Sequence, residues 1–315
     1  MTHRVLVACG HLQRNIDHYR DFLREHDIEV EIPVVDQQLN EEELLEIIAG
    51  FDGVVAGDDH FTERVLQKGR RLRIVAKWGV GVDRIDREAA KRLGIQVTNT
   101  PGAFGDEVAD VAMGYVISLA RHLHRIDREV RRGEWYQPPG RTLRGQTLGI
   151  VGLGSIGQAL ARRAGAFGME LVGCDPRPPN DSFVKETRMS LHALDVMLER
   201  TDFLVLCCDS NPDNHHLVNA ERLGRMKRGS FLVNVSRGAL VNEEALIEAL
   251  STGQLGGAGL DVFENEPLSA DNRLRTFENC ILGSHNGSNT VQAVDRINEL
   301  VLRQLVEGLE KEATS

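Results

Sequence analysis

Short apolar runs alternate with amphipathic segments along the first hundred residues. Runs rich in Val and Ile at 4–10, 28–33, 53–57, 73–79 and 95–100 predict strands. Segments with helical spacing lie between them, at about 13–25, from Glu41, from Thr62 and at 86–93. The helix from Glu41 has a capping sequence, because Asn40 can accept from free backbone amides and Glu43 can reach back to it. Strands that alternate with helices predict parallel pairing, and therefore an α/β doubly wound sheet.

A second set of strands and helices follows a break at Pro101 and Gly102. An apolar helix at about 105–124 and a polar stretch lead into strand-like runs at 147–154, 170–176, 203–208, 230–236, 256–263 and 280–285. Helices are expected between them, to 167, near 191–200, from Ala220 and from Glu243. The last helix, at 290–310, has no strand after it, so we expect it to return to the first domain. The pattern predicts two doubly wound parallel-sheet domains, the second inserted into the first.

The amino-acid composition indicates what class of protein this is. The 315 residues are 41% hydrophobic and 27% charged, which is typical of a folded protein with two domains of moderate size. The net charge of −10 repels a phosphate backbone and argues against nonspecific nucleic-acid binding. No apolar run approaches the roughly 20 residues of a membrane span, and the N-terminal run predicts a buried strand instead of a signal peptide. Five scattered cysteines predict reduced core residues of a cytoplasmic protein.

A glycine-rich turn joins the strand at 147–154 to the helix that follows. It contains the GxGxxG motif of dinucleotide-binding sites, with Gly152, Gly154 and Gly157. The first glycine permits the tight turn, the second lets the backbone approach a pyrophosphate, and the third lets the helix lie close to the strand. The amides of Ser155 and Ile156, at the positive end of the helix, would then bind the phosphate oxygens.

Asp175 ends the next strand, 18 positions beyond Gly157. An acidic residue at this place accepts hydrogen bonds from both ribose hydroxyls of the adenosine, and its charge repels a 2′-phosphate. Arg177 lies two residues further and weakens that preference. Because strand, motif, helix, strand and terminal acid occur in one unit, the sequence predicts a site that binds NAD in preference to NADP.

Three polar residues with complementary chemistry follow strands further along the chain: Arg237, Glu266 and His285. The carboxyl ends of parallel strands share one edge of a sheet, so these side chains can converge where a nicotinamide would lie. Taken singly, each has a plainer explanation, as a surface ion pair, a loop acid before a proline, and a capping or core histidine. Together, beside a cofactor, they indicate a reaction site.

Five motifs, over about residues 50 to 290, resemble those of the D-isomer-specific 2-hydroxyacid dehydrogenases. They are VGVDRID (80–86), the glycine-rich unit through Asp175, NVSRGALVNEEAL (234–246), GLDVFENEPL (259–268) and SHNGS (284–288). The spacings of 29 positions from Arg237 to Glu266 and 19 from Glu266 to His285 are also similar, and the phosphoglycerate dehydrogenases are the nearest branch. The resemblance implies a Rossmann NAD-binding domain at 101–285, inserted into a flavodoxin-like substrate-binding domain at 1–100 plus 286–315, in a homodimer.

The resemblance also implies an NAD-dependent oxidoreductase that transfers a hydride between the nicotinamide and C2 of a D-2-hydroxy acid or 2-oxo acid. His285 would give the proton in the reduction, and Glu266 would favour the protonated ring and raise its pKa. Arg237 would hold the substrate carboxylate and carbonyl oxygen. The further implied contacts are those of Val80, Gly81 and Lys77 with the substrate, Asp261 with the nicotinamide carboxamide, and Cys208 and Ser236 with the cofactor.

The sequence departs from the family at several positions around the expected site. Cys208 and Ser284 stand at usual prolines, and Gln137, Pro138 and Gly57 stand where basic residues that bind a phosphate are usual. Lys77 alone would face a substrate phosphate. A phosphorylated substrate similar to 3-phosphoglycerate therefore stays open, and we expect only a 2-hydroxy acid.

Two other functions are less favoured. Cys207, Cys208, His215 and His216 could suggest a metal site, but the cysteines end an apolar strand without CxxC spacing, so we expect no metal and solvated histidines. An NAD(H)-sensing, corepressor-like interaction protein would keep the same fold and the same three polar residues, but nothing in the sequence marks a peptide-binding cleft.

The homodimer implied by the resemblance is expected to form through the helix after residue 105. Trp135 and Tyr136 could reach the active site of a neighbouring subunit or merely pack against it.

Overall fold

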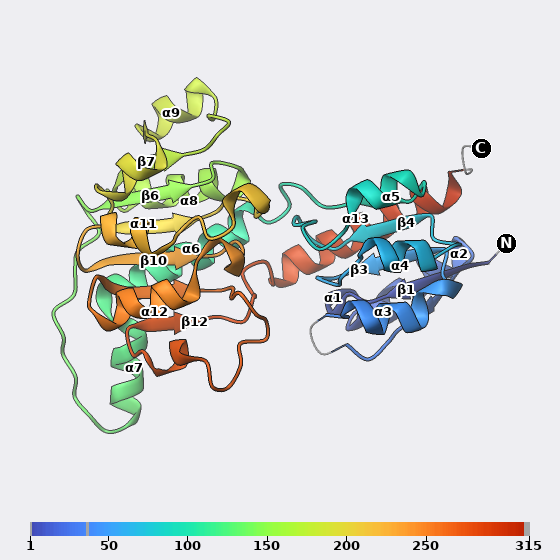
Figure 1. Ribbon diagram of the computed structural model, residues 1–315, viewed down its shortest axis with the longest axis horizontal. Helices are drawn as coiled ribbons and strands as arrows, with labels where there is room; N and C mark the ends of the chain where they lie inside the picture. Colours follow the sequence, from blue (N-terminus) through green and yellow to red (C-terminus); the bar gives the residue numbers. More distant parts are fainter. Residues whose placement is uncertain (1, 36–37, 312–315) are drawn as a thin grey trace. The chain divides into compact units, whose positions relative to one another are not determined.

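The computed structural model describes residues 2–35 and 38–311. Its contacts divide the chain into two compact units, Met1–Ala103 with Thr290–Ser315, and Phe104–Asn289. The domain boundaries expected from the sequence, after residues 100 and 285, lie within a few residues of these. Each unit has its own parallel sheet (Figure 1).

The first unit is built on a five-stranded parallel sheet. Its spatial order is β2 (Ile28–Glu31), β1 (His3–Val7), β3 (Gly53–Ala56), β4 (Ile74–Lys77) and β5 (Gln96–Thr98). The order 2-1-3-4-5 is that of flavodoxin-like sheets. Every residue of β3 and β4 is buried, as expected for parallel strands covered on both faces.

The helices of this unit are α1 (Gly10–Gln13), α2 (Arg20–Glu25), α3 (Glu41–Ile47), α4 (Glu63–Lys68), α5 (Arg87–Arg92) and α13 (Val291–Glu310). The predicted cap of α3 is confirmed, because Asn40 Oδ1 accepts from the amide of Glu43 and the Glu43 carboxylate accepts from the amide of Asn40. The long helix α13 packs on β3 and β4 (Figure 1). The chain after the inserted unit therefore completes the first one.

The prediction of a single helix at 13–25 is wrong. α1 ends at Gln13, and a short 3-10 helix at Ile16–Tyr19 and then α2 follow it. Asn15 lies between the first two with φ −114° and ψ 7°, outside the helical region, and its side chain donates to the carbonyl of His11. A side-chain amide that bonds the local backbone competes with the helix in this way.

The second unit is built on a seven-stranded parallel sheet. Its spatial order is β12 (Cys280–Leu282), β11 (Leu255–Leu260), β10 (Ser230–Asn234), β9 (Phe203–Leu206), β6 (Thr147–Val151), β7 (Glu170–Cys174) and β8 (Ser190–Leu191). Counted within the unit, the first six strands have the Rossmann order 3-2-1-4-5-6, and β12 extends the sheet. The order reverses between β6 and β9, which is where such sheets bind ligands.

The helices of this unit are α6 (Gly105–Arg121), α7 (Leu123–Arg131), α8 (Ser155–Ala166), α9 (Asp181–Thr187), α10 (Leu194–Leu198), α11 (Ala220–Arg225) and α12 (Glu243–Ser251). α6 packs on α8, β10 and β11, which buries its apolar side. Strand β8 and helix α9 were not predicted, because β8 has only two residues and both are exposed. The helix expected near 191–200 begins only at Leu194.

The predicted fold class is confirmed: two doubly wound parallel-sheet units, the Rossmann unit inserted into the flavodoxin-like one. Of the helices in residues 2–35 and 38–311, none combines the length and the apolar character that a membrane span needs.

Candidate active site

The residues singled out in the second unit lie along one edge of its sheet, directly after the carboxyl ends of the strands. From β12 across to β7, the residues that follow successive strands are His285, Glu266 with Asp261, Arg237 with Ser236, Cys208, the glycine-rich turn, and Asp175. The turn and Asp175 follow β6 and β7, on one side of the point where the strand order reverses. Arg237, Glu266 and His285 follow β10, β11 and β12, three of the four strands on the other side of that point. One end of the edge therefore has the features of a dinucleotide site, and the other carries groups suited to acid–base chemistry.

The glycine-rich turn is shaped for close approach of a ligand. Gly152 has φ +92°, and a Cβ there would lie 2.5 Å from the amide nitrogen of Cys208. A Cβ on Gly157 would lie 2.0 Å from the carbonyl oxygen of Gly152, so only glycine lets α8 start this close to the turn. Gly154 is the N-cap of α8, and no side chain caps the helix and no acid lies in its first turn. The first amides of α8, including those of Ser155 and Ile156, therefore suit the pyrophosphate of a dinucleotide.

Asp175 is held in place by the backbone. Its Oδ2 accepts from the amide of Leu153 (2.7 Å) in the glycine-rich turn, and its Oδ1 accepts from the amide of Arg177 (2.7 Å). A carboxylate has about four acceptor positions, so two are left for ribose hydroxyls. The adenosine half of NAD therefore fits these residues.

Cys208 lies beside the same turn. Its carbonyl accepts from the hydroxyl of Ser236, which joins the loops after β9 and β10. Burial raises the pKa of Cys208 to about 12, so its thiol is neutral near pH 7.

His285 and Glu266 form a direct pair. His285 Nδ1 lies 2.7 Å from Glu266 Oε2, and their side chains are 25% and 9% exposed. The other carboxylate oxygen of Glu266 accepts from the amide of Phe263 (2.9 Å), which fixes the orientation of the carboxylate. Since Nδ1 is directed at Glu266, proton exchange with a substrate would take place at the other ring nitrogen, Nε2.

Arg237 is positioned by the loop after β10. Asn234 Nδ2 donates to the carbonyl of Arg237 (2.8 Å), and Asn234 Oδ1 accepts from the amide of Ser236 (3.1 Å). A Cβ on the next residue, Gly238, would lie 1.8 Å from the carbonyl carbon of Phe263, so this loop packs directly on the loop that carries Glu266. The structure thus places the loops of Arg237 and Glu266 in contact on neighbouring strands.

Asp261 is 3% exposed and bonds the segment that carries His285. Its carbonyl accepts from the amide of His285 (2.7 Å), and its carboxylate accepts from the amides of Asn286 (3.2 Å) and Gly287 (2.8 Å). The hydroxyl of Tyr115, on α6, also donates to this carboxylate (3.2 Å). Sequence reasoning missed Tyr115, because its place in an apolar helix gives no sign of a polar role.

His215 and His216 were expected to be solvated. His215 is exposed, whereas His216 is only partly exposed and makes specific contacts. Its Nε2 lies 2.8 Å from Glu264 Oε1, its Nδ1 lies 3.2 Å from Asn242 Nδ2, and its ring stacks on that of His215 at 3.8 Å. Glu264 also accepts from the amide of Glu243 (3.1 Å). The pair therefore joins the loop after β9 to the loop that carries Glu266.

The residues of the first unit predicted to contact substrate lie at the end of β4, where Lys77 is the last residue, and just after it, at Val80 and Gly81. Within the described part of the chain, the amides of Val80 and Gly81 make no hydrogen bond, so both are available as donors. Lys77 differs from expectation, because it is buried and its ammonium donates to Asp58 Oδ1 (3.0 Å) and the carbonyl of Trp78 (3.0 Å). Two of its three donors are therefore already used within this unit.

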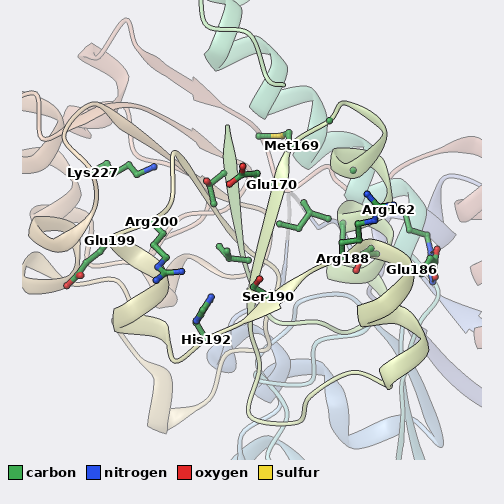
Figure 2. A pocket seen from close by; sticks show the side chains of 17 residues that line it. Arg162, Met169, Glu170, Glu186, Arg188, Ser190, His192, Glu199, Arg200 and Lys227 are labelled. Atoms are coloured by element: carbon green, nitrogen blue, oxygen red, sulfur yellow. Dashed lines mark hydrogen bonds and ion pairs between the residues drawn. The ribbon is translucent and has the colours of Figure 1, made fainter. Parts of the chain in front are cut away.

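A hollow of about 1000 Å³ lies at the opposite edge of the second sheet (Figure 2). Its lining includes the first residues of β6, β7 and β8, namely Thr147, Glu170 and Ser190. Its cations are nearly balanced by acids, with Arg162, Arg188, Arg200 and Lys227 against Glu170, Glu186 and Glu199. Arg162 bonds Glu186 and Lys227 bonds Asp202. The charges therefore select no ligand, and the hollow is separate from the cofactor edge.

In residues 2–35 and 38–311, no group of three or more His, Cys, Asp or Glu side chains is arranged so that it could hold a metal ion. Cys207 and Cys208, considered above as potential ligands, are partly buried neutral thiols, since burial raises the pKa of both.

Comparison with known proteins identifies relatives over most of the chain. The chain is 37% identical over 287 residues to the hydroxypyruvate reductase of Thermotoga maritima, covering 90% of this chain and 91% of that protein. It is 39% identical over 294 residues to the glyoxylate reductase of Thermococcus onnurineus, covering 90% and 87%. The D-3-phosphoglycerate dehydrogenase of Methanocaldococcus jannaschii is 38% identical over 277 residues, covering 87% of this chain but 53% of that protein.

Solved structures agree with the sequence comparisons. D-Lactate dehydrogenase from Aquifex aeolicus, complexed with NAD and lactic acid, matches with a TM-score of 0.86 and 27% identity over 97% of this chain and 96% of that one. The NAD-binding domain model of the D-isomer-specific 2-hydroxyacid dehydrogenases matches residues 113–287, which contain the glycine-rich turn and the three polar residues. The chain therefore belongs to the D-isomer-specific 2-hydroxyacid dehydrogenase family, and NAD is its cofactor.

Proposed function

We propose that this protein reduces a small, unphosphorylated 2-oxo acid with NADH, and that glyoxylate and hydroxypyruvate are its substrates. The observation that carries the proposal is the 2.7 Å pair of His285 and Glu266 at the carboxyl edge of the NAD-binding sheet. The names of the relatives from Thermotoga maritima and Thermococcus onnurineus support these two substrates.

In the proposed reaction, the cofactor supplies the hydride, and side chains of the protein supply the proton and bind the substrate. When bound, NADH supplies the hydride that reduces C2 of the 2-oxo acid. His285 gives the proton to the carbonyl oxygen from Nε2, and Glu266 stabilises the imidazolium before the transfer. Arg237 binds the carboxylate and stabilises the charge that develops on the carbonyl oxygen. In the oxidation direction, neutral His285 accepts the proton of the hydroxyl group.

The remaining contacts are proposed from the family resemblance. The free amides of Val80 and Gly81 bind the substrate carboxylate, and one further acceptor position of Asp261 receives the nicotinamide carboxamide. Lys77 is the weakest of the predicted contacts, because Asp58 and the carbonyl of Trp78 already use two of its donors. This is why we favour an unphosphorylated substrate over a phosphoglycerate-like one.

The test is a panel of 2-oxo acids with the purified protein and NADH, followed by the loss of absorbance at 340 nm. We expect turnover of glyoxylate and hydroxypyruvate well above that of 3-phosphohydroxypyruvate. His285→Ala should lose turnover and keep NADH binding, whereas His192→Ala, which alters the hollow at the opposite sheet edge, should keep both. NADH binding without turnover of any panel member would contradict the enzyme and favour the NAD(H)-sensing interaction protein.

We further propose a homodimer, with α7 in its interface in place of α6. The apolar side of α6 is buried within its own unit, whereas no residue of α7 is buried. Leu123 and Val130 are 47% and 45% exposed, and Trp135, just beyond α7, is 80% exposed. Exposed apolar groups gathered on one segment are typical of an interface. Light scattering should give twice the chain mass of 34.9 kDa, and a monomer would contradict the dimer.

A further inference from the structure

We propose that Tyr115 is a positioning residue for the reaction: its hydroxyl holds the Asp261 carboxylate, which in turn holds the turn that carries His285. The inference rests on the proposed function, because it concerns the proton transfer by His285. It adds a residue on α6 to a site otherwise built from loops after the strands.

The turn that carries His285 needs support from outside. His285 has φ +54°, a left-handed backbone conformation that is costly for a residue with a side chain. Such a conformation persists only where surrounding contacts determine it. Here the contacts come from Asp261, whose carbonyl accepts from the amide of His285 and whose carboxylate accepts from the amides of Asn286 and Gly287.

Tyr115 fixes that carboxylate from the other side. Its hydroxyl lies 3.2 Å from Asp261 Oδ1, the same oxygen that accepts from the amide of Asn286. Burial raises the pKa of Tyr115, and the nearby charge of Asp261 raises it further, so the phenol keeps its proton and remains a donor. A donor to a buried carboxylate makes a charge-assisted hydrogen bond, which is stronger than one between neutral groups.

Two glycines make room for this contact. A Cβ on Gly283 would lie 2.4 Å from the Tyr115 hydroxyl and 2.3 Å from Asp261 Oδ1. A Cβ on Gly259 would lie 2.8 Å from the Cβ of Tyr115. Side chains at either position would exclude the phenol or the carboxylate, since non-bonded atoms do not pack at such distances. The base of the Tyr115 side chain is therefore accommodated by Gly259 in β11, and its hydroxyl by Gly283, just after β12.

Three of the roughly four acceptor positions of the Asp261 carboxylate are filled by Tyr115, Asn286 and Gly287. Without the phenol, Oδ1 keeps only the longer bond from the amide of Asn286 (3.2 Å), so this side of the carboxylate is held less firmly. The effect should then appear in the placement of His285, and so in the chemical step, more than in cofactor affinity, because the glycine-rich turn and Asp175 supply most of the proposed cofactor contacts and Asp261 supplies only one.

The test compares Tyr115→Phe with Tyr19→Phe. Each removes one hydroxyl and keeps the ring, but Tyr19 lies in the first unit, where its hydroxyl donates to the carbonyl of Asp295 (3.5 Å). We expect Tyr115→Phe to lower kcat for glyoxylate about tenfold, or about 1.4 kcal/mol. The Kd of NADH should change less than about twofold on this reasoning, and Tyr19→Phe should match the wild type.

Two further measurements separate positioning from general stability. If Tyr115 acts through the carboxylate, Tyr115→Phe should have little additional effect in the Asp261→Asn background, so the two losses should not add. Hydrogen exchange of the amides of Asn286 and Gly287 should be faster in Tyr115→Phe, because these amides donate to Asp261. A structural role alone would lower the melting temperature without this local change.

The proposal is overturned if kcat and amide exchange equal those of the wild type, or if Tyr115→Phe costs the same factor in both backgrounds. Wild-type protein that turns over no 2-oxo acid would overturn the proposed function alone, because the exchange comparison requires no turnover. Unchanged exchange at Asn286 and Gly287 would then overturn the role of Tyr115 independently.

Discussion

Replacing Glu266 with Gln tests the acid–base pair directly. The carboxylate of Glu266 has one oxygen 2.7 Å from His285 Nδ1 and the other 2.9 Å from the amide of Phe263. A Gln side chain of the same shape has one acceptor oxygen and one NH₂ donor. If the oxygen keeps its bond with Phe263, the NH₂ group faces His285 Nδ1 and requires that nitrogen to accept. The substitution therefore removes both the negative charge and the acceptor that favour an imidazolium.

The size of the effect follows from the burial of the pair. Hydrogen bonds to charged groups contribute about 1.5 to 3 kcal/mol, and each pH unit corresponds to about 1.4 kcal/mol. Both side chains are mostly buried, 25% and 9% exposed, so solvent screens the interaction weakly. We therefore expect Glu266→Gln to make the protonated form of His285 less stable by about 1.5 to 3 kcal/mol relative to the neutral form.

The assay is the pH profile of kcat/KM for glyoxylate reduction with saturating NADH. Reduction needs protonated His285, so kcat/KM should fall as pH rises, and in Glu266→Gln this fall should begin at lower pH than in the wild type. Above the wild-type transition, the variant should be about 10- to 100-fold slower, whereas at low pH the two rates should approach each other. Oxidation of the 2-hydroxy acid needs the neutral ring and should be less impaired near pH 7.

The control is Glu264→Gln, which removes a charge from the same loop, where Glu264 pairs with His216 (2.8 Å). It should leave the transition where the wild type has it. The reasoning is refuted if Glu266→Gln has the wild-type transition, or if both variants shift it equally, because the effect would then be a general loss of charge.

Three further predictions concern Asp175, the glycine-rich turn and the buried cysteines. Asp175→Ala should weaken NADH binding about 10- to 100-fold, measured by fluorescence titration. It should also abolish the preference for NADH over NADPH, because it removes the charge that repels a 2′-phosphate. A retained preference would contradict the role of Asp175. Gly157→Ala should destabilise the protein by about 1 to 3 kcal/mol and lose NADH binding, since its Cβ would lie 2.0 Å from the Gly152 carbonyl oxygen. The control is Gly165→Ala in the same helix, whose Cβ would lie 3.8 Å from the nearest atom, a side-chain carbon of Leu171. This variant should melt at or above the wild-type temperature. Equal losses of stability in the two variants would contradict the importance of the close approach at Gly157. Burial raises the pKa of Cys208 and Cys280 to about 12, so roughly one thiol in ten thousand is ionised at pH 8. These cysteines should therefore react slowly with iodoacetamide in the native protein and rapidly in urea. Fast labelling of Cys208 in the native protein would show that its thiol is not buried.

Local features were predictable because their causes lie within a few neighbouring residues. The GxGxxG turn, α8 and Asp175 occupy one continuous segment, and glycine geometry together with the dipole of a helix end determines what they can bind. The cap at Asn40 and Glu43 was predictable for the same reason. Strand β8 was not, because two exposed residues carry no hydrophobic period.

The contacts that complete the candidate site join positions far apart in the sequence. Tyr115 and Asp261 are separated by 146 positions, and only the packing of α6 against β11 brings the phenol to the carboxylate. His216 and Glu264 lie in loops after different strands, so their residue types alone predicted solvated histidines. Lys77 has the charge expected of a substrate contact, but the fold buries it against Asp58.

The sequence by itself determined the alternation of strands and helices, the dinucleotide turn and the order of Arg237, Glu266 and His285 along the chain, since each depends on local propensity, glycine geometry or motif spacing. Tertiary structure decided which of the polar residues pair: the parallel register of β10, β11 and β12 sets the carboxyl ends side by side and allows a left-handed turn to direct His285 toward Glu266. Pairing depends on distances between strands, and those distances are properties of the packed sheet.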